Sequence, residues 1–185
     1  MIASATQLAE LGQRYSSALA GAAAQILVCA GPGCAASGSR RVFERVKEEL
    51  HKRGSHVTVD YLLENGGSPC TGAVTLESGC QGFCQQGPLV RVEPAGVLYT
   101  KVRPEDVPEL VDAVLEGAVV ERLLYHEPET GRACPQEAEI PFYRTQVRIA
   151  LENCGAIDPE DIRTYIARGG YQGLAKALAM DRTAL

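Results

Sequence analysis

Four of the seven cysteines in this chain fall into two closely spaced pairs. Cys29 and Cys34 enclose four residues, and Cys80 and Cys84 enclose three. Each pair lies in a glycine-rich segment, CAGPGC or CQGFC, after an apolar run with the pattern of a strand. Glycine leaves room beside the backbone for a bulky metal centre and lets amide N–H groups point at sulfur. The four thiols are therefore candidate ligands of a metal centre.

Two kinds of metal centre suit this set of thiols. A 2Fe-2S cluster takes four thiolates, two on each iron, and N–H···S hydrogen bonds help to set its reduction potential. A structural zinc ion also takes four thiolates, although zinc pairs more often enclose two residues than the three or four present here. Spacing alone leaves both metals open.

Three other interpretations are weaker. Thiol oxidoreductases use the spacing C-x-x-C, which is absent from this sequence. The loop GPGCAASG lies between a strand and a helix, but it matches neither of the two common phosphate-binding glycine motifs. Isolated cysteines often pack as small hydrophobic residues, but four of them in two loop pairs argue against that explanation.

The remaining cysteines and the three histidines show no ligand spacing. We expect Cys154, in the turn NCG, to pack in the interior, and Cys70, in SPCTG, to be partly exposed and open to oxidation. Cys134 lies in a polar, turn-rich segment. His51 falls on a solvated helix and His56 begins a strand, so we predict no catalytic residue.

Composition limits the class of protein. The chain has 185 residues and a net charge of −5, so we expect one domain with extensions and neither a nucleic-acid nor an anionic-membrane partner. No apolar run approaches the ~18 residues of a membrane-spanning helix, and the N-terminus lacks the basic start of a signal peptide. We therefore predict a cytoplasmic location, where seven reduced cysteines point to metal or redox chemistry.

The elements that must position the thiols follow from hydrophobic spacing. We predict helices over residues 4–24, about 39–53 and 104–117, and strands over residues 25–30, 56–63, 72–78, 89–94 and 97–102. Ser37 or Ser39 can cap the second helix, and Asp158 followed by Pro159 can begin a helix in the tail. The strands at 89–94 and 97–102 form a hairpin at Ala95–Gly96. The order βαβ followed by ββα predicts an α/β fold, a thioredoxin-like mixed sheet with flanking helices. An N-terminal helix and a C-terminal helical extension complete the prediction.

The cysteine segments also carry a resemblance. CAGPGC, followed by CQGFCQQGPLVRVEPAGVLYTKVRPEDVPELVDAVLEG, resembles the thioredoxin-like 2Fe-2S ferredoxin family, which includes the small iron–sulfur subunit of respiratory complex I. The resemblance covers residues 25 to about 117. It implies a 2Fe-2S cluster whose ligands are Cys29, Cys34, Cys80 and Cys84, and it favours iron–sulfur over zinc.

A second resemblance begins near Ile140. IPFYRTQVRIALENCGAIDPEDIRTYIARGGYQGLAKAL is similar to the opening of the NADH-binding flavoprotein subunit of complex I. Related subunits occur in NAD-dependent and electron-bifurcating hydrogenases and formate dehydrogenases, several with a ferredoxin domain in front. The resemblance implies that FMN, NADH and 4Fe-4S sites belong only to a continuation of the chain or to partner subunits.

These patterns give a division of the chain and a function. We predict an N-terminal helix (1–24), a 2Fe-2S ferredoxin domain (25–117), a connector (118–138) and the helical start of a flavoprotein domain (139–185). The predicted function is one-electron transfer in an NAD(P)-dependent, FMN-containing multisubunit oxidoreductase, with the flavoprotein body as partner. The alternative is a zinc-stabilised assembly module that docks a larger subunit. Short apolar helices in the tail are expected to pack on the flavoprotein body.

Overall fold

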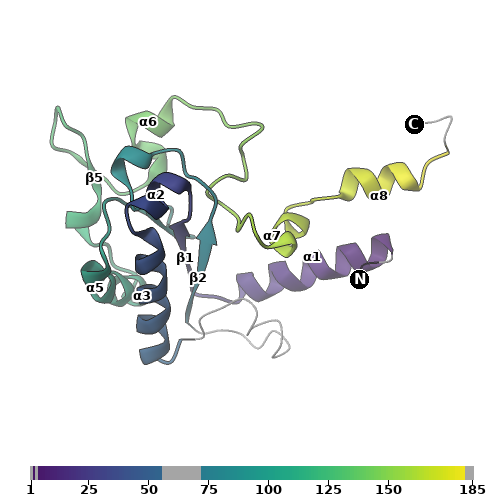
Figure 1. Cartoon of the computed structure of the whole chain (residues 1–185), viewed down its shortest axis with the longest axis horizontal. Coiled ribbons are helices and arrows are strands. Elements are labelled where there is room, and N and C mark those ends of the chain that lie inside the picture. The colour runs from purple at the N-terminus through teal and green to yellow at the C-terminus, as the bar shows by residue number, and fades with distance from the viewer. Residues whose placement is uncertain (1, 3, 56–71, 182–185) are drawn as a thin grey trace.

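A four-stranded mixed sheet forms the centre of the computed structural model, which describes residues 2, 4–55 and 72–181 (Figure 1). The strands are β1 (Ala24–Cys29), β2 (Ala73–Ser78), β3 (Val90–Glu93) and β4 (Val97–Tyr99), in the order β2-β1-β3-β4. β1 runs parallel to β2 and antiparallel to β3, and β3 is antiparallel to β4. The mixed sheet predicted from the sequence is confirmed.

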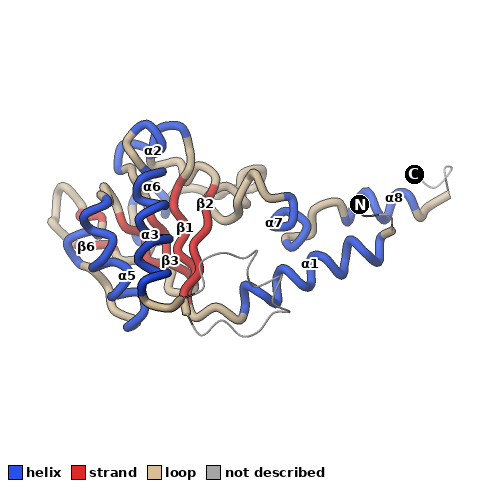
Figure 2. Tube along the Cα trace, turned by 60° about the horizontal axis from the view of Figure 1, so that its bottom comes forward, coloured by secondary structure: helices blue, strands red, loops and turns tan. Residues whose placement is uncertain are grey.

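Two helices, α3 (Ser39–Lys52) and α5 (Val107–Glu116), cover one face of the sheet (Figure 2). Successive side chains of a strand point to opposite faces, so Ile26 and Val28 of β1 enter the core beneath these helices. Val42, Val46 and Leu50 meet them from α3 at helical spacing. Burial of this apolar stripe holds α3 against β1 and so positions the segment between them, which carries Cys34.

The expected elements compare closely with the observed ones. Four predicted strands are present as β1 to β4, together with the hairpin at Ala95–Gly96 and the helices on the sheet. The predicted strand at 56–63 lies outside the described residues. The predicted serine cap of α3 is wrong: Gly38, with φ +99°, precedes the helix, and Ser39 is already its first residue. A short helix, α2 (Pro32–Ala36), replaces the loop expected between the first two cysteines.

The predicted connector folds onto the sheet. It contains a small hairpin of β5 (Tyr125–His126) and β6 (Ala133–Cys134) and a short 3-10 turn at Glu121–Leu123. A second 3-10 turn at Glu137–Glu139 ends it, and α6 (Pro141–Arg144) follows. Backbone bridges join Val97 to Gln136 and Tyr99 to Leu124, so the segment follows the edge strand β4. Cys134 of the connector is buried and packs with Leu89 and Leu98, and Ile140 and Tyr143, which follow the connector, join the same cluster. The domain limit at residue 117 stays a prediction.

The N-terminal helix and the tail extend from the sheet on the same side (Figure 1). α1 (Ala5–Ala20) packs on α7 (Ile162–Ala167), and a Cβ at Gly12 would meet the Ile166 carbonyl oxygen at 3.3 Å. α8 (Gln172–Leu178) follows, with Leu174 and Leu178 exposed. None of the described helices has the length and apolar character needed to cross a bilayer.

The start of α7 differs from the prediction. The sequence suggested that Asp158 caps the helix and that Pro159 is its first residue. Asp161 is the observed cap, and its carboxylate accepts a hydrogen bond from the Arg163 N–H at 2.9 Å. Asp158 instead accepts from the Glu160 N–H at 2.8 Å and closes a turn before the helix.

Candidate metal centre

The two cysteine pairs lie at one edge of the sheet because β1 and β2 are parallel neighbours. Cys29 is the last residue of β1, opposite Ser78 at the end of β2. The carboxyl ends of parallel strands meet at the same edge, so the loops that follow them emerge side by side. Cys34 lies in α2, in the first loop, and Cys80 and Cys84 lie in the second. All six cysteines in the described ranges are free thiols.

Glycines let the two loops interleave. A Cβ on Gly31 would stand 3.0 Å from the Cys80 Cβ and 3.2 Å from its Sγ. A Cβ on Gly33 would meet Cys84 at the same two distances. Real side chains rarely tolerate such contacts, so the CAGPGC segment approaches the second thiol pair only because these residues are glycine.

Gly87 makes the closest approach. A Cβ there would lie 2.7 Å from the Cys34 Sγ. The second loop thus closes on the first pair just as the first loop closes on the second pair. These glycines form a cradle against the sulfurs of Cys34, Cys80 and Cys84, which is the arrangement that a bulky thiolate-bound centre requires.

Within each pair the sulfurs are in contact. The Sγ atoms of Cys80 and Cys84 are 3.9 Å apart. A hydrogen bond from the Cys34 thiol lowers the pKa of Cys29 to about 6, and the same contact raises the pKa of Cys34. The contact therefore favours the thiolate form of Cys29, which is the form that binds metal.

The thiols are grouped in two contacting pairs. Tetrahedral zinc, with Zn–S distances of about 2.3 Å, brings its four sulfurs to roughly 3.8 Å from one another. Among the residues that the structure describes, no three His, Cys, Asp or Glu side chains surround one point where a single ion would bind. Two contacting pairs match a centre with two thiolates on each iron.

Backbone N–H groups also point at the sulfurs. The Gly82 N–H lies 3.4 Å from the Cys80 Sγ, and Gly82 adopts a φ of +87° that favours glycine. Backbone hydrogen bonds from Gln81 and Gly31 favour the thiolate form of Cys29, and one from Leu89 does so for Cys34. Such N–H···S bonds tune iron–sulfur potentials.

One set of contacts was missed by sequence reasoning. Phe83, between Cys80 and Cys84, stacks on Phe142 with ring centroids 4.6 Å apart. Tyr143 and Arg148 both donate hydrogen bonds to the Gln81 carbonyl oxygen. The adjacent aromatics Phe142 and Tyr143, in a chain that is only 5% aromatic, were the available signal.

The cysteines outside the two pairs and the histidines are not part of the thiol site. Cys134 is fully buried in the core beside the first thiol pair, and Cys154 is half-buried in a turn. His51 is exposed on α3, as expected. Cys70 and His56 lie outside the described residues.

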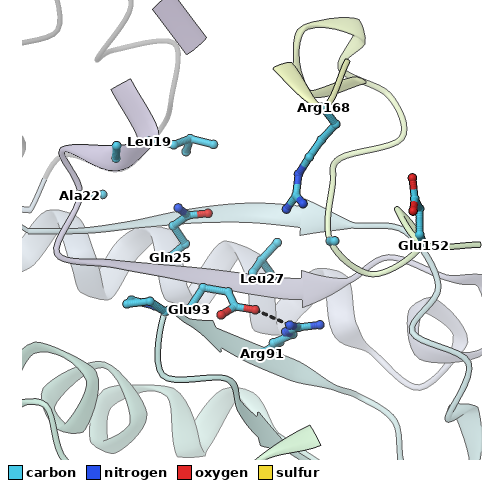
Figure 3. A pocket seen from close by; sticks show the side chains of 11 residues that line it. Leu19, Ala22, Gln25, Leu27, Arg91, Glu93, Glu152 and Arg168 are labelled. Carbon is cyan, nitrogen blue, oxygen red and sulfur yellow. Dashed lines mark ion pairs between the residues drawn. The ribbon is translucent and has the colours of Figure 1, made fainter. Parts of the chain in front are cut away.

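A hollow of about 580 Å³ lies on the sheet face that carries Gln25 and Leu27 (Figure 3). The end of α1, β3 and the tail border it, and Arg91 pairs there with Glu93. No cysteine lines this hollow, so it is separate from the thiol site.

Comparison with known proteins agrees with the site. A family model described as thioredoxin-like [2Fe-2S] ferredoxin matches residues 4–115. The 2Fe-2S ferredoxin of Aquifex aeolicus (strain VF5) is 38% identical over 92 residues, 49% of this chain and 71% of that protein. The 2Fe-2S ferredoxin of Clostridium pasteurianum is 35% identical over 91 residues, 49% of this chain and 76% of that protein.

Two further similarities differ in extent. The NADP-reducing hydrogenase subunit HndC of Solidesulfovibrio fructosivorans is 62% identical over 37 residues, which are 20% of this chain and 8% of that protein. The crystal structure of the wild-type thioredoxin-like [2Fe-2S] ferredoxin from Aquifex aeolicus is 34% identical, with a TM-score of 0.42, and covers 56% of this chain and 97% of that one.

The family match settles the choice that spacing left open. It spans residues 4–115, more than half of the chain, and includes all four paired cysteines. The 2Fe-2S cluster expected from the sequence is therefore confirmed as the cofactor, in preference to zinc. The chain belongs to the thioredoxin-like [2Fe-2S] ferredoxin family, with its mixed α/β sheet and its electron-transfer cluster.

Proposed function

We propose that Cys29, Cys34, Cys80 and Cys84 hold the 2Fe-2S cluster and that the chain passes single electrons within an NAD(P)-dependent, FMN-containing multisubunit oxidoreductase. The supporting observation is the glycine cradle that brings two thiol pairs from parallel strand ends into one site. When bound, the cluster supplies the one-electron chemistry. The chain's own residues bind the irons, exclude water on the side of β1 and donate backbone N–H bonds to sulfur.

The metal content tests this ligand set. Protein purified anaerobically should hold about two irons and two sulfides for each chain, as four thiolates of a 2Fe-2S site imply. It should absorb visible light and bleach on reduction. Stoichiometric zinc without visible absorbance, in protein made with ample iron, would contradict the proposal.

We further propose that the tail after α6 docks on the flavoprotein body, in the cytoplasm. The similarity to a hydrogenase subunit supports a multisubunit redox complex. Three apolar side chains are strongly exposed in the segment that follows α6: Val147 (88%), Ile149 (81%) and Leu151 (60%). Contiguous exposed apolar residues mark interaction sites more often than isolated ones do.

Hydrogen exchange tests the docking of the tail. In the isolated chain, the amides of residues 149–152 should exchange within seconds, and limited proteolysis should cut there, because Ile149 and Leu151 are exposed and unsupported. In the assembled complex, both the rate of amide exchange and the proteolytic cleavage of this segment should be strongly reduced. Residues 107–116, in the core helix α5, serve as the control that stays protected in both states. Equal protection of residues 149–152 in both states would contradict docking.

A further inference from the structure

One peptide unit in the second cysteine loop accepts hydrogen bonds from the segment beyond the family match. This unit joins Gln81 to Gly82, between the two cysteines of the CQGFC motif. Its N–H, on Gly82, points at the Cys80 Sγ at 3.4 Å. Its carbonyl oxygen, on Gln81, accepts hydrogen bonds from the Tyr143 hydroxyl and from Arg148 Nη2, each at 3.1 Å.

The two donors are held rigidly by their surroundings. Tyr143 is only 7% exposed, and burial raises its pKa, so the phenol keeps the proton that it donates. The Arg148 guanidinium carbon lies 4.8 Å from the centre of the Tyr143 ring, a cation–π distance. Arg148 also pairs with Glu137 at 3.4 Å, and Glu137 pairs with Arg91 of β3 at 2.6 Å. The core strand thus anchors the donors.

We propose that Tyr143 and Arg148 are positioning residues that tune the cluster through the Gln81–Gly82 peptide. This inference rests on the proposed ligand role of Cys80. Both residues lie outside residues 4–115, so the device is an addition to the ferredoxin domain of this chain.

The physical basis is the polarisation of one amide. A carbonyl that accepts a charge-assisted bond makes the N–H of the same peptide a stronger donor, because hydrogen bonds in chains reinforce one another. A stronger N–H···S bond stabilises the more negative, reduced cluster and raises its potential. The positive charge of Arg148 acts in the same direction. Loss of either donor should therefore lower the potential.

The test is the reduction potential of the cluster, measured by anaerobic titration of the full chain. Arg148→Gln should shift the potential to a more negative value and change the visible circular dichroism of the cluster. Tyr143→Phe, which removes one oxygen, should shift it in the same direction by less. Arg148→Lys, which keeps the charge, should recover part of the loss.

Arg144→Gln is the matched control. Arg144 is an exposed cation in the same segment, and in the described part of the chain its side chain makes no hydrogen bond to Gln81. It should leave both the potential and the dichroism at their wild-type values. If Arg148→Gln reduces cluster content, Tyr143→Phe carries the test alone.

The outcomes separate this inference from the proposed function. Wild-type protein without two irons and two sulfides would overturn both. Wild-type protein with a full cluster, but with potentials and dichroism of Arg148→Gln and Tyr143→Phe equal to those of Arg144→Gln, would overturn only the tuning role.

Discussion

The first thiol pair is part of the hydrophobic core, whereas the second pair lies on an open loop. Cys29 and Cys34 are 1% and 0% exposed and pack with Leu89 and Leu98. Cys84 is exposed and Cys80 is half-buried, in a loop with only a single 3-10 turn. The fold of the sheet therefore fixes the first pair, and contacts from elsewhere in the chain must fix the second.

Those contacts come from the segment around α6. Phe142 stacks on Phe83, and the Tyr143 hydroxyl and Arg148 hold the carbonyl of Gln81. The open side of the site carries no such cover at Cys84. We expect electrons to enter and leave through the second pair, because transfer to a partner requires close approach and the first pair is closed to solvent.

Replacement of the four proposed ligands should have the largest effect and should distinguish the two pairs. Serine is a harder and far less acidic ligand than cysteine, so every replacement should perturb the cluster strongly. Cys29→Ser and Cys34→Ser should lose nearly all of the iron, because the core leaves no route for another ligand. Cys80→Ser and Cys84→Ser should keep part of it, with a shifted visible spectrum. Iron analysis measures the retained iron, and absorbance measures the visible spectrum.

The reverse order would break the comparison. If Cys84→Ser lost all its iron while Cys34→Ser retained a cluster, the buried pair would not be the anchor of the site.

An added methyl group at Gly87 should have the next largest effect. Its Cβ would lie 2.7 Å from the Cys34 Sγ and 3.2 Å from the Cys84 carbonyl oxygen. Gly87 has an ordinary φ of −70°, so these contacts, and not backbone strain, are responsible. Overpacking of this kind costs about 1–3 kcal/mol. Gly87→Ala should lower cluster content and thermal stability together.

Gly173→Ala provides the control for that change. Gly173 lies in α8, and an added Cβ there meets nothing within 4 Å. Cluster content should stay at the wild-type level, because alanine favours a helix and touches no ligand. A similar loss of iron in both variants would show that the Gly87 contact with Cys34 is unimportant.

The sequence predicted the thiol set and the sheet, but not what supports the second pair. The four cysteines are candidate ligands because of their short spacings, and strands such as β1 were predicted because buried apolar runs have a clear pattern. β5 and β6 are two residues each, too short to give a period. The Arg148 contact with Gln81 joins residues 67 apart in the sequence, and no local pattern encodes it.

Helix boundaries failed for a related reason. Asp158 and Asp161 are both good caps, and both accept a backbone N–H two residues ahead. A carboxylate at either position can accept a backbone N–H, so the local sequence does not decide where the helix begins. α7, which begins after Asp161, packs against α1, and Gly12 of α1 is far from it in the sequence.

The cysteines outside the pairs should have the smallest effect on the site. Cys134 is fully buried beside the first pair, and burial raises its pKa, so it remains a neutral thiol. Cys134→Ser should cost about 1–3 kcal/mol, because it buries a hydroxyl in an apolar site, yet leave the visible spectrum nearly unchanged. Cys154→Ser, at a half-buried turn, should cost less than about 0.5 kcal/mol, and its spectrum should also be unchanged. Thermal unfolding and absorbance, recorded on the same samples, separate stability from ligation. A bleached Cys134→Ser protein with wild-type stability would mean that this core thiol is itself a ligand, and the division into two pairs would fail.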